Sequence, residues 1–111
     1  MEGLNMADLF GKMMEMQQKM AEVQEGLARL TVTAEAGGGM VRVTANGQQR
    51  ITALKIEPGV IDPDDPEMLE DLIIAGVNKA LDEAAAMAQK ELQKVAGGFL
   101  PPGMDPGRLG L

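Results

Sequence analysis

Two short stretches of the sequence could do chemistry, and the first is a run of three glycines, Gly37-Gly38-Gly39. Glycine-rich loops hold phosphate groups when a helix follows them, because the start of that helix offers N–H groups and the positive end of its dipole. Here the glycines lead into Met40-Val41-Arg42-Val43, which alternates like a strand, and no Gly-Lys-Ser/Thr sequence follows. The sequence therefore favours a hairpin loop over a phosphate site.

The second stretch is acidic, and its carboxylates could supply oxygen ligands to a hard cation. It contains Asp62, Asp64, Asp65 and Glu67. The residue spacing and the turn glycine of a calcium loop are absent. Asp65 stands directly before Pro66, which is the order typical of a helix N-cap and first helical residue, and Glu67 suits the positive end of the helix dipole. We interpret the stretch as a helix start and predict no metal site.

The side chains available for catalysis are few, because the chain contains no His, Cys, Ser or Tyr. The usual nucleophiles and the usual base at neutral pH are therefore missing. Thr, Lys, Asp and Glu remain, and we expect the carboxylates to lie on helix surfaces or at caps. The sequence predicts no catalytic residue, no cofactor and no small-molecule substrate. The lack of cysteine also excludes a disulfide and a thiolate metal site.

Two long helices are predicted from the spacing of apolar residues. The first shows a three-four repeat, typical of a heptad seam, at Met6, Leu9, Met13, Met16, Met20, Val23, Leu27 and Leu30. We interpret this methionine stripe mainly as a helix–helix core, with a peptide-binding groove as the alternative. The second helix is predicted from about Pro66 to about Val95, with Gly97-Gly98 ending it, and its apolar stripe comprises Leu69, Ile73, Val77, Leu81, Ala84, Ala88, Leu92 and Val95.

Between the helices the apolar residues alternate with period two, which predicts three strands. The segments are Thr31–Ala36, Met40–Ala45 and Arg50–Glu57, and Asn46-Gly47 is a strong hairpin signal between the last two because both residues tolerate positive φ. In the third segment Ile51 falls on the wrong face relative to Leu54 and Ile56, so we expect a β-bulge near Thr52. The predicted fold is α+β, with a long helix, a three-stranded antiparallel meander and a second long helix.

Length and composition indicate one domain that associates with itself. The chain has 111 residues, of which 45% are hydrophobic but only 2% aromatic, so its core must be small and aliphatic. Residues 1–96 are expected to form a single domain, followed by a Pro/Gly-rich tail over 97–111. The first ten residues lack the features of a signal peptide, and no stretch has the roughly 18 apolar residues of a membrane span.

The order of these motifs resembles the bacterial YbaB/EbfC family of nucleoid-associated proteins, over nearly the whole chain. The similarity lies in "AGGGMVRV", "NG", "IEPGVIDP", "LEDLIIAGVNKAL" and the "GG…PPG" tail. The resemblance implies a cytoplasmic, tweezer-like homodimer at the nucleoid that binds double-stranded DNA and alters its conformation. Roles implied for the family are nucleoid organisation and regulation of gene expression.

The net charge of −7 means that any DNA contact must be local, because DNA binding depends on neutralised phosphates. If the two helices pack antiparallel, four lysines could come together, namely Lys12, Lys19, Lys90 and Lys94; the alternative is a solvated surface with pairs such as Glu15–Lys19. Arg42 and Arg50 on the sheet are the next candidates. The charge also leaves open a second function, that of a non-catalytic, dimeric protein-interaction module with little affinity for DNA.

Overall fold

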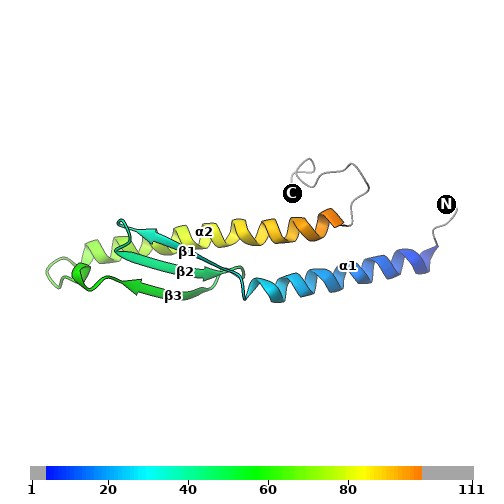
Figure 1. Ribbon diagram of the computed structural model, residues 1–111, viewed down its shortest axis with the longest axis horizontal. Coiled ribbons are helices and arrows are strands. Elements are labelled where there is room, and N and C mark those ends of the chain that lie inside the picture. Colours follow the sequence, from blue (N-terminus) through cyan, green and yellow to red (C-terminus); the bar gives the residue numbers. More distant parts are fainter. Residues whose placement is uncertain (1–4, 99–111) are drawn as a thin grey trace. The chain divides into compact units, whose positions relative to one another are not determined.

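The computed structural model describes residues 5–98 and shows two long helices with a small sheet between them in sequence (Figure 1). The elements are α1 (Met6–Leu27), β1 (Thr31–Ala36), β2 (Val41–Asn46), β3 (Ile51–Ile56), a short 3-10 helix η1 (Pro58–Val60) and α2 (Pro66–Gly98). This order confirms the predicted α+β fold. Most of the predicted tail, from Phe99 onward, lies outside the described residues.

The chain divides into two compact units. The sheet unit comprises Leu27–Ala88, and the described part of the helical unit comprises residues 5–26 and 89–98. Because α2 continues from Pro66 to Gly98, its first part belongs to the sheet unit and its last turns to the helical unit. Neither helix in the described part of the chain has both the length and the apolar character needed to cross a membrane.

The sheet is an antiparallel meander in the order β1-β2-β3. Between β2 and β3 the register steps from the pair Thr44–Ala53 to the pair Ala45–Ile51, so Thr52 is an extra residue on β3. This is the predicted β-bulge, and it returns Ile51 to the face that Leu54 and Ile56 share. The conflict in the sequence pattern is thereby resolved as expected.

The glycine run forms the predicted hairpin loop between β1 and β2. Gly37, Gly38 and Gly39 have φ angles of +63°, +68° and +99°, a region that other residues rarely adopt. The amide of Met40 closes the turn by donating to the Gly37 carbonyl at 3.4 Å. Strand β2 follows the loop, so the glycines do not lead into a helix as those of a phosphate-binding loop do.

The Asn46-Gly47 turn is a hairpin as predicted, but the expected positive φ is at Gln49 (+58°) rather than at either of these two residues. The Asn46 carboxamide oxygen accepts hydrogen bonds from the amides of Gln48 and Arg50, at 2.9 and 3.2 Å. Gly47 is required for a different reason, since a Cβ there would lie 2.8 Å from the carbonyl oxygen of Leu27. The Asn-Gly sequence therefore predicted the position of the turn correctly, but the glycine is needed for close packing and not for a positive φ.

The core of the sheet unit lies between α2 and one face of the sheet. Its buried residues are Ala34, Val41, Val43, Ala45, Ala80 and Ala84. Small residues on α2 permit a close approach, because a Cβ on Gly76 would lie 2.9 Å from Cγ2 of Val43. Of the β3 side chains, Ile56 packs against this core, whereas Leu54 remains 47% exposed on the same face.

The helix ends agree in part with the sequence. The Asp65 carboxylate accepts a hydrogen bond from the amide of Met68 at 3.4 Å, and α2 begins at Pro66, which confirms the predicted cap. Helix α1 ends at Leu27, so the last seam residue, Leu30, lies beyond it. Helix α2 continues to Gly98 instead of ending near Val95, because the glycines are its last two residues rather than a stop before them.

Candidate nucleic-acid interface

The four candidate lysines all belong to the helical unit. Lys12 and Lys19 lie on α1, one heptad apart, and Lys90 and Lys94 lie on the last turns of α2. All four residues are exposed. Long, exposed ammonium side chains on helices are suited to contact phosphate oxygens, which supply much of the affinity of proteins for DNA.

The two helical segments of this unit run in opposite directions (Figure 1). Met20 of α1 lines a shared hollow with Gln89, Leu92, Gln93 and Ala96 of α2. Lys19 precedes Met20 in the sequence, and Lys90 and Lys94 follow Gln89 and Gln93. The segments that carry the four lysines thus run antiparallel, but none of the lysines lines this hollow, and their convergence on one site stays a prediction.

Ion pairs in the described residues partly occupy the basic side chains. Lys94 Nζ lies 3.0 Å from Glu91 Oε1, an exposed pair within one helical turn. Arg42 Nε lies 3.3 Å from Glu35 Oε1 on the sheet. These two are the ion pairs of residues 5–98, and the Glu15–Lys19 pair considered from the sequence is not one of them. Exposed pairs of this kind stabilise weakly, so they yield readily to a phosphate.

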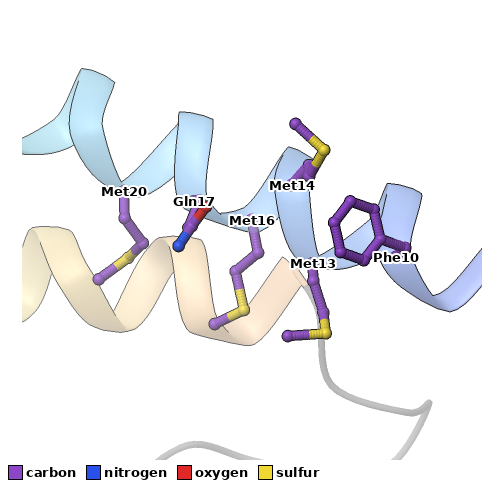
Figure 2. Close-up of a pocket in the computed structure, with 6 residues that line it drawn as sticks. All are labelled: Phe10, Met13, Met14, Met16, Gln17 and Met20. Atoms are coloured by element: carbon purple, nitrogen blue, oxygen red, sulfur yellow. The ribbon is translucent and has the colours of Figure 1, made fainter.

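The first half of α1 presents an apolar groove of about 510 Å³, shown in Figure 2. Its lining residues are Phe10, Met13, Met14, Met16, Gln17 and Met20. Met13, Met16 and Met20 point toward the side on which α2 lies, whereas Met14 points away from it (Figure 2). Phe10, which lies outside the predicted seam, is 64% exposed, and the seam residues Leu9 and Met13 are 45% and 63% exposed, so the described residues leave this part of the helix largely uncovered.

The acidic stretch after the sheet is used for local backbone structure. The Asp62 carboxylate accepts a hydrogen bond from the amide of Asp64 at 2.9 Å, and Asp65 caps α2. Within residues 5–98 no group of three or more acidic, His or Cys side chains is placed to hold a metal ion. These carboxylates therefore organise the entry into α2.

Two basic residues lie side by side on the sheet face opposite α2, and only one of them was identified from the sequence. Arg42 of β2 and Lys55 of β3 are direct cross-strand neighbours there, and both are exposed. Arg42 was considered from the sequence, but Lys55 was not. The alternation of residues along β3 puts Lys55 on the face away from the core. Only the pairing register between β2 and β3 brings it beside Arg42. Strand pairing, which the sequence does not state, was the missing signal.

The sequence of the chain is similar to one described family over most of its length. The sequence profile of the YbaB/EbfC DNA-binding family matches residues 1–99. A nucleoid-associated protein of Chlorobium phaeobacteroides is 47% identical over 98 residues, which cover 88% of this chain and 86% of the relative. A nucleoid-associated protein of Syntrophobacter fumaroxidans is 51% identical over 89 residues, which cover 80% and 81%.

The fold is also found in a solved structure. An uncharacterized protein from Helicobacter pylori, known from a crystal structure, matches with a TM-score of 0.64 and 21% identity. The match covers 88% of this chain and 99% of that one. At this level of identity the similarity supports the arrangement of helices and strands and carries no argument about the site.

Proposed function

The chain belongs to the YbaB/EbfC DNA-binding family, and on this premise we propose that it is a nucleoid-associated protein that binds duplex DNA as a homodimer. It acts in the cytoplasm at the nucleoid, where it alters the conformation of DNA and contributes to nucleoid organisation and gene regulation. The observation that carries the proposal is the family match over residues 1–99, joined by relatives that are named nucleoid-associated proteins. The protein acts by binding and has no catalytic role.

The contact with DNA is made mainly to phosphates, at Lys12, Lys19, Lys90 and Lys94. Their exposure and their place on two antiparallel helical segments support this assignment. By the rise of an α-helix, α1 is about 33 Å long and α2 about 50 Å, which is enough for helical arms to follow a duplex. Because phosphate contacts are the same for every sequence, this mode of binding gives a strong dependence on salt and little sequence preference.

Low specificity is also supported by what the chain offers for reading bases. Its two aromatic residues are both phenylalanine, so a platform for stacking several bases is not available. In residues 5–98 the three strands separate the two helices in sequence, so the adjacent helix pair of a helix-turn-helix motif is absent. The shape and flexibility of the duplex are then the main source of any preference.

Dimerisation is supported by apolar side chains that the sheet unit leaves exposed. Ile51, Leu54, Ile61 and Ile74 are 41%, 47%, 57% and 59% exposed. Ile51 and Leu54 lie on the core-facing side of β3, where α2 leaves them uncovered. A second copy that covers this side of β3 would enlarge a core which is small and lacks buried aromatic residues.

The test is a titration of duplex DNA at about 50 and 200 mM salt, with the wild type and with Lys12, Lys19, Lys90 and Lys94 all changed to Gln. We expect the affinity of the variant to fall equally for unrelated duplexes. The slope of log K against log salt should shrink by about 0.9 for each lysine that meets a phosphate. The variant should keep the oligomeric state of the wild type.

A pair of double variants controls for net charge. Lys12→Gln with Lys19→Gln is compared with Arg29→Gln and Lys79→Gln, two exposed basic residues outside the proposed contact. The first pair should weaken binding more than the second. Equal losses would show that only total charge matters and would contradict the lysine site.

A second candidate function is supported by the apolar groove on α1. Flexible methionine side chains adapt to many apolar surfaces, so this groove suits a helix or an extended peptide of another protein. In this case the chain is a dimeric protein-interaction module with little affinity for DNA. A wild type that shows no salt-dependent binding to duplex DNA at about 50 mM salt would favour this function over the first.

A further inference from the structure

The sheet has one covered and one open face in the sheet unit. Helix α2 packs on the face of Val41 and Val43, and the pairing register places Glu35, Arg42 and Lys55 on the other face. Glu35, Arg42 and Lys55 are exposed, and no described element of this unit packs over them. We refer to this surface as the open face.

Charge is distributed unevenly along the sheet unit. Residues 27–56, which comprise the three strands and the turns beside them, have one acidic residue, Glu35. Their four basic residues are Arg42 and Lys55 in the strands and Arg29 and Arg50 outside them. The segment that follows, 57–88, has nine acidic residues and one basic residue, Lys79. Within the strands themselves the charged residues are Arg42, Lys55 and Glu35, a net charge of +1 in a chain of net charge −7, and all three lie on the open face.

Hydroxyl groups continue the open face beside these two cations. Thr33 and Thr44 are cross-strand neighbours, and their hydroxyl oxygens lie 2.9 Å apart. The Thr52 hydroxyl, at the bulge, donates to the carbonyl oxygen of Thr44 at 3.4 Å. Threonine hydroxyls and exposed Arg and Lys side chains are common partners of phosphate and sugar oxygens in complexes with DNA.

From this arrangement we propose that the open face binds the sugar–phosphate backbone of duplex DNA, with Arg42 and Lys55 as the phosphate contacts. The inference rests on the proposed function and adds a contact surface separate from the four lysines of the helical unit. The two cations of this face exceed its one carboxylate, that of Glu35, so its net charge is complementary to that of DNA. Apart from the small side chain of Ala53, the residues of the face are polar, and none is aromatic, so it offers donors to the backbone and no platform for bases.

Glu35 limits this contact, because its carboxylate holds the Arg42 guanidinium at 3.3 Å in an exposed ion pair. A phosphate that approaches Arg42 must compete with that carboxylate and is repelled by it. Removal of the Glu35 charge should therefore strengthen binding. An increase in affinity is a useful signal, because a damaged fold does not produce it.

The experiment compares two pairs of substitutions that change the charge equally inside and outside the open face, with all four residues in the sheet unit and exposed. Lys55→Gln is matched by Lys79→Gln, and Glu35→Gln is matched by Glu67→Gln. Duplex affinity and its salt slope are measured for each variant as full-length protein, and the secondary structure is checked by circular dichroism.

We expect Lys55→Gln to weaken binding by roughly threefold at about 200 mM salt for each Lys55 of the dimer that meets a phosphate, relative to Lys79→Gln, and to lower the salt slope by about 0.9 for each such contact. Glu35→Gln should strengthen binding by a similar factor relative to Glu67→Gln. If the wild type binds DNA but each variant has the same affinity and salt slope as its matched control, the open-face proposal is overturned. The proposed contacts of the four lysines are not affected by that result. If the wild type does not bind duplex DNA at all, the proposed function fails, and this inference fails with it.

Discussion

The amide of Gly47 donates a hydrogen bond of 2.8 Å to the carbonyl oxygen of Leu27, the last residue of α1. The same amide also lies 2.9 Å from the carbonyl oxygen of Leu30. The turn between β2 and β3 is thus attached to the segment through which the chain leaves the helix and enters β1. The attachment requires a residue without a side chain at position 47.

Substitution Gly47→Ala should destabilise the protein by about 1–3 kcal/mol, because its Cβ would lie 2.8 Å from a backbone oxygen that is itself held in place. Urea unfolding followed by circular dichroism measures the effect. Gly59→Ala is the matched control, since a Cβ at that position has no neighbouring atom within 4 Å. A Gly47→Ala protein as stable as the control would mean that the turn moves away from Leu27 without cost.

Substitution Gly38→Val should lower stability by roughly 1–3 kcal/mol through the backbone alone. Gly38 has a φ of +68°, and nothing lies within 4 Å of a Cβ placed on it. Gly38→Asn should cost less, because Asn tolerates positive φ better than a β-branched residue does. Both variants should bind DNA as the wild type does where they are folded. Loss of binding by a stable Gly38→Val protein would make the loop a contact site.

Alanine in place of two helical glycines should change stability in opposite directions. A Cβ added to Gly11 of α1 would meet no atom within 4 Å, so Gly11→Ala should stabilise the protein by about 1 kcal/mol through helix propensity. Gly76→Ala should destabilise it, because Cγ2 of Val43 lies 2.9 Å from the new Cβ and overpacking exceeds the gain in propensity. Thermal unfolding of both variants shows whether each substitution raises or lowers the melting temperature.

Substitution Leu54→Lys should weaken self-association. Leu54 is 47% exposed on the core-facing side of β3, where a second copy would bury it. Burial of an unpaired lysine ammonium at that position costs free energy, whereas burial of leucine is favourable. Sedimentation at micromolar concentration should give twice 11.8 kDa for the wild type and a lower mass for the variant. Ala53→Lys, one residue away and on the opposite face, should remain dimeric. A wild-type monomer would contradict the proposed dimer itself.

The sequence predicted the elements well because local patterns determine them. The strands at Thr31–Ala36 and Ile51–Ile56, the bulge at Thr52 and the cap at Asp65 each follow from alternation or from a capping rule. The end of α1 was predicted less well, because Leu30 continues the heptad spacing but the chain turns after Leu27, where Gly47 binds the carbonyl oxygens of both residues. That contact is tertiary and leaves no local pattern.

The candidate site was harder to predict than the fold. The lysines could be named from helix spacing, and they remain a prediction. The neighbourhood of Arg42 and Lys55 depends on the register of β2 against β3, which the bulge at Thr52 helps to fix. Charges that are thirteen residues apart in sequence become neighbours only through that pairing. Surface electrostatics are therefore predicted from the sequence only as far as strand pairing is known.

The extra residue at Thr52 also bears on how the protein avoids aggregation. Strand β3 is an edge of the sheet, and a regular edge offers its unpaired N–H and C=O groups to strands of other molecules. The bulge interrupts that regular row and bends the strand, while the charge of Lys55 disfavours a like-charged neighbour. An irregular, charged edge of this kind therefore disfavours the joining of chains into intermolecular sheets.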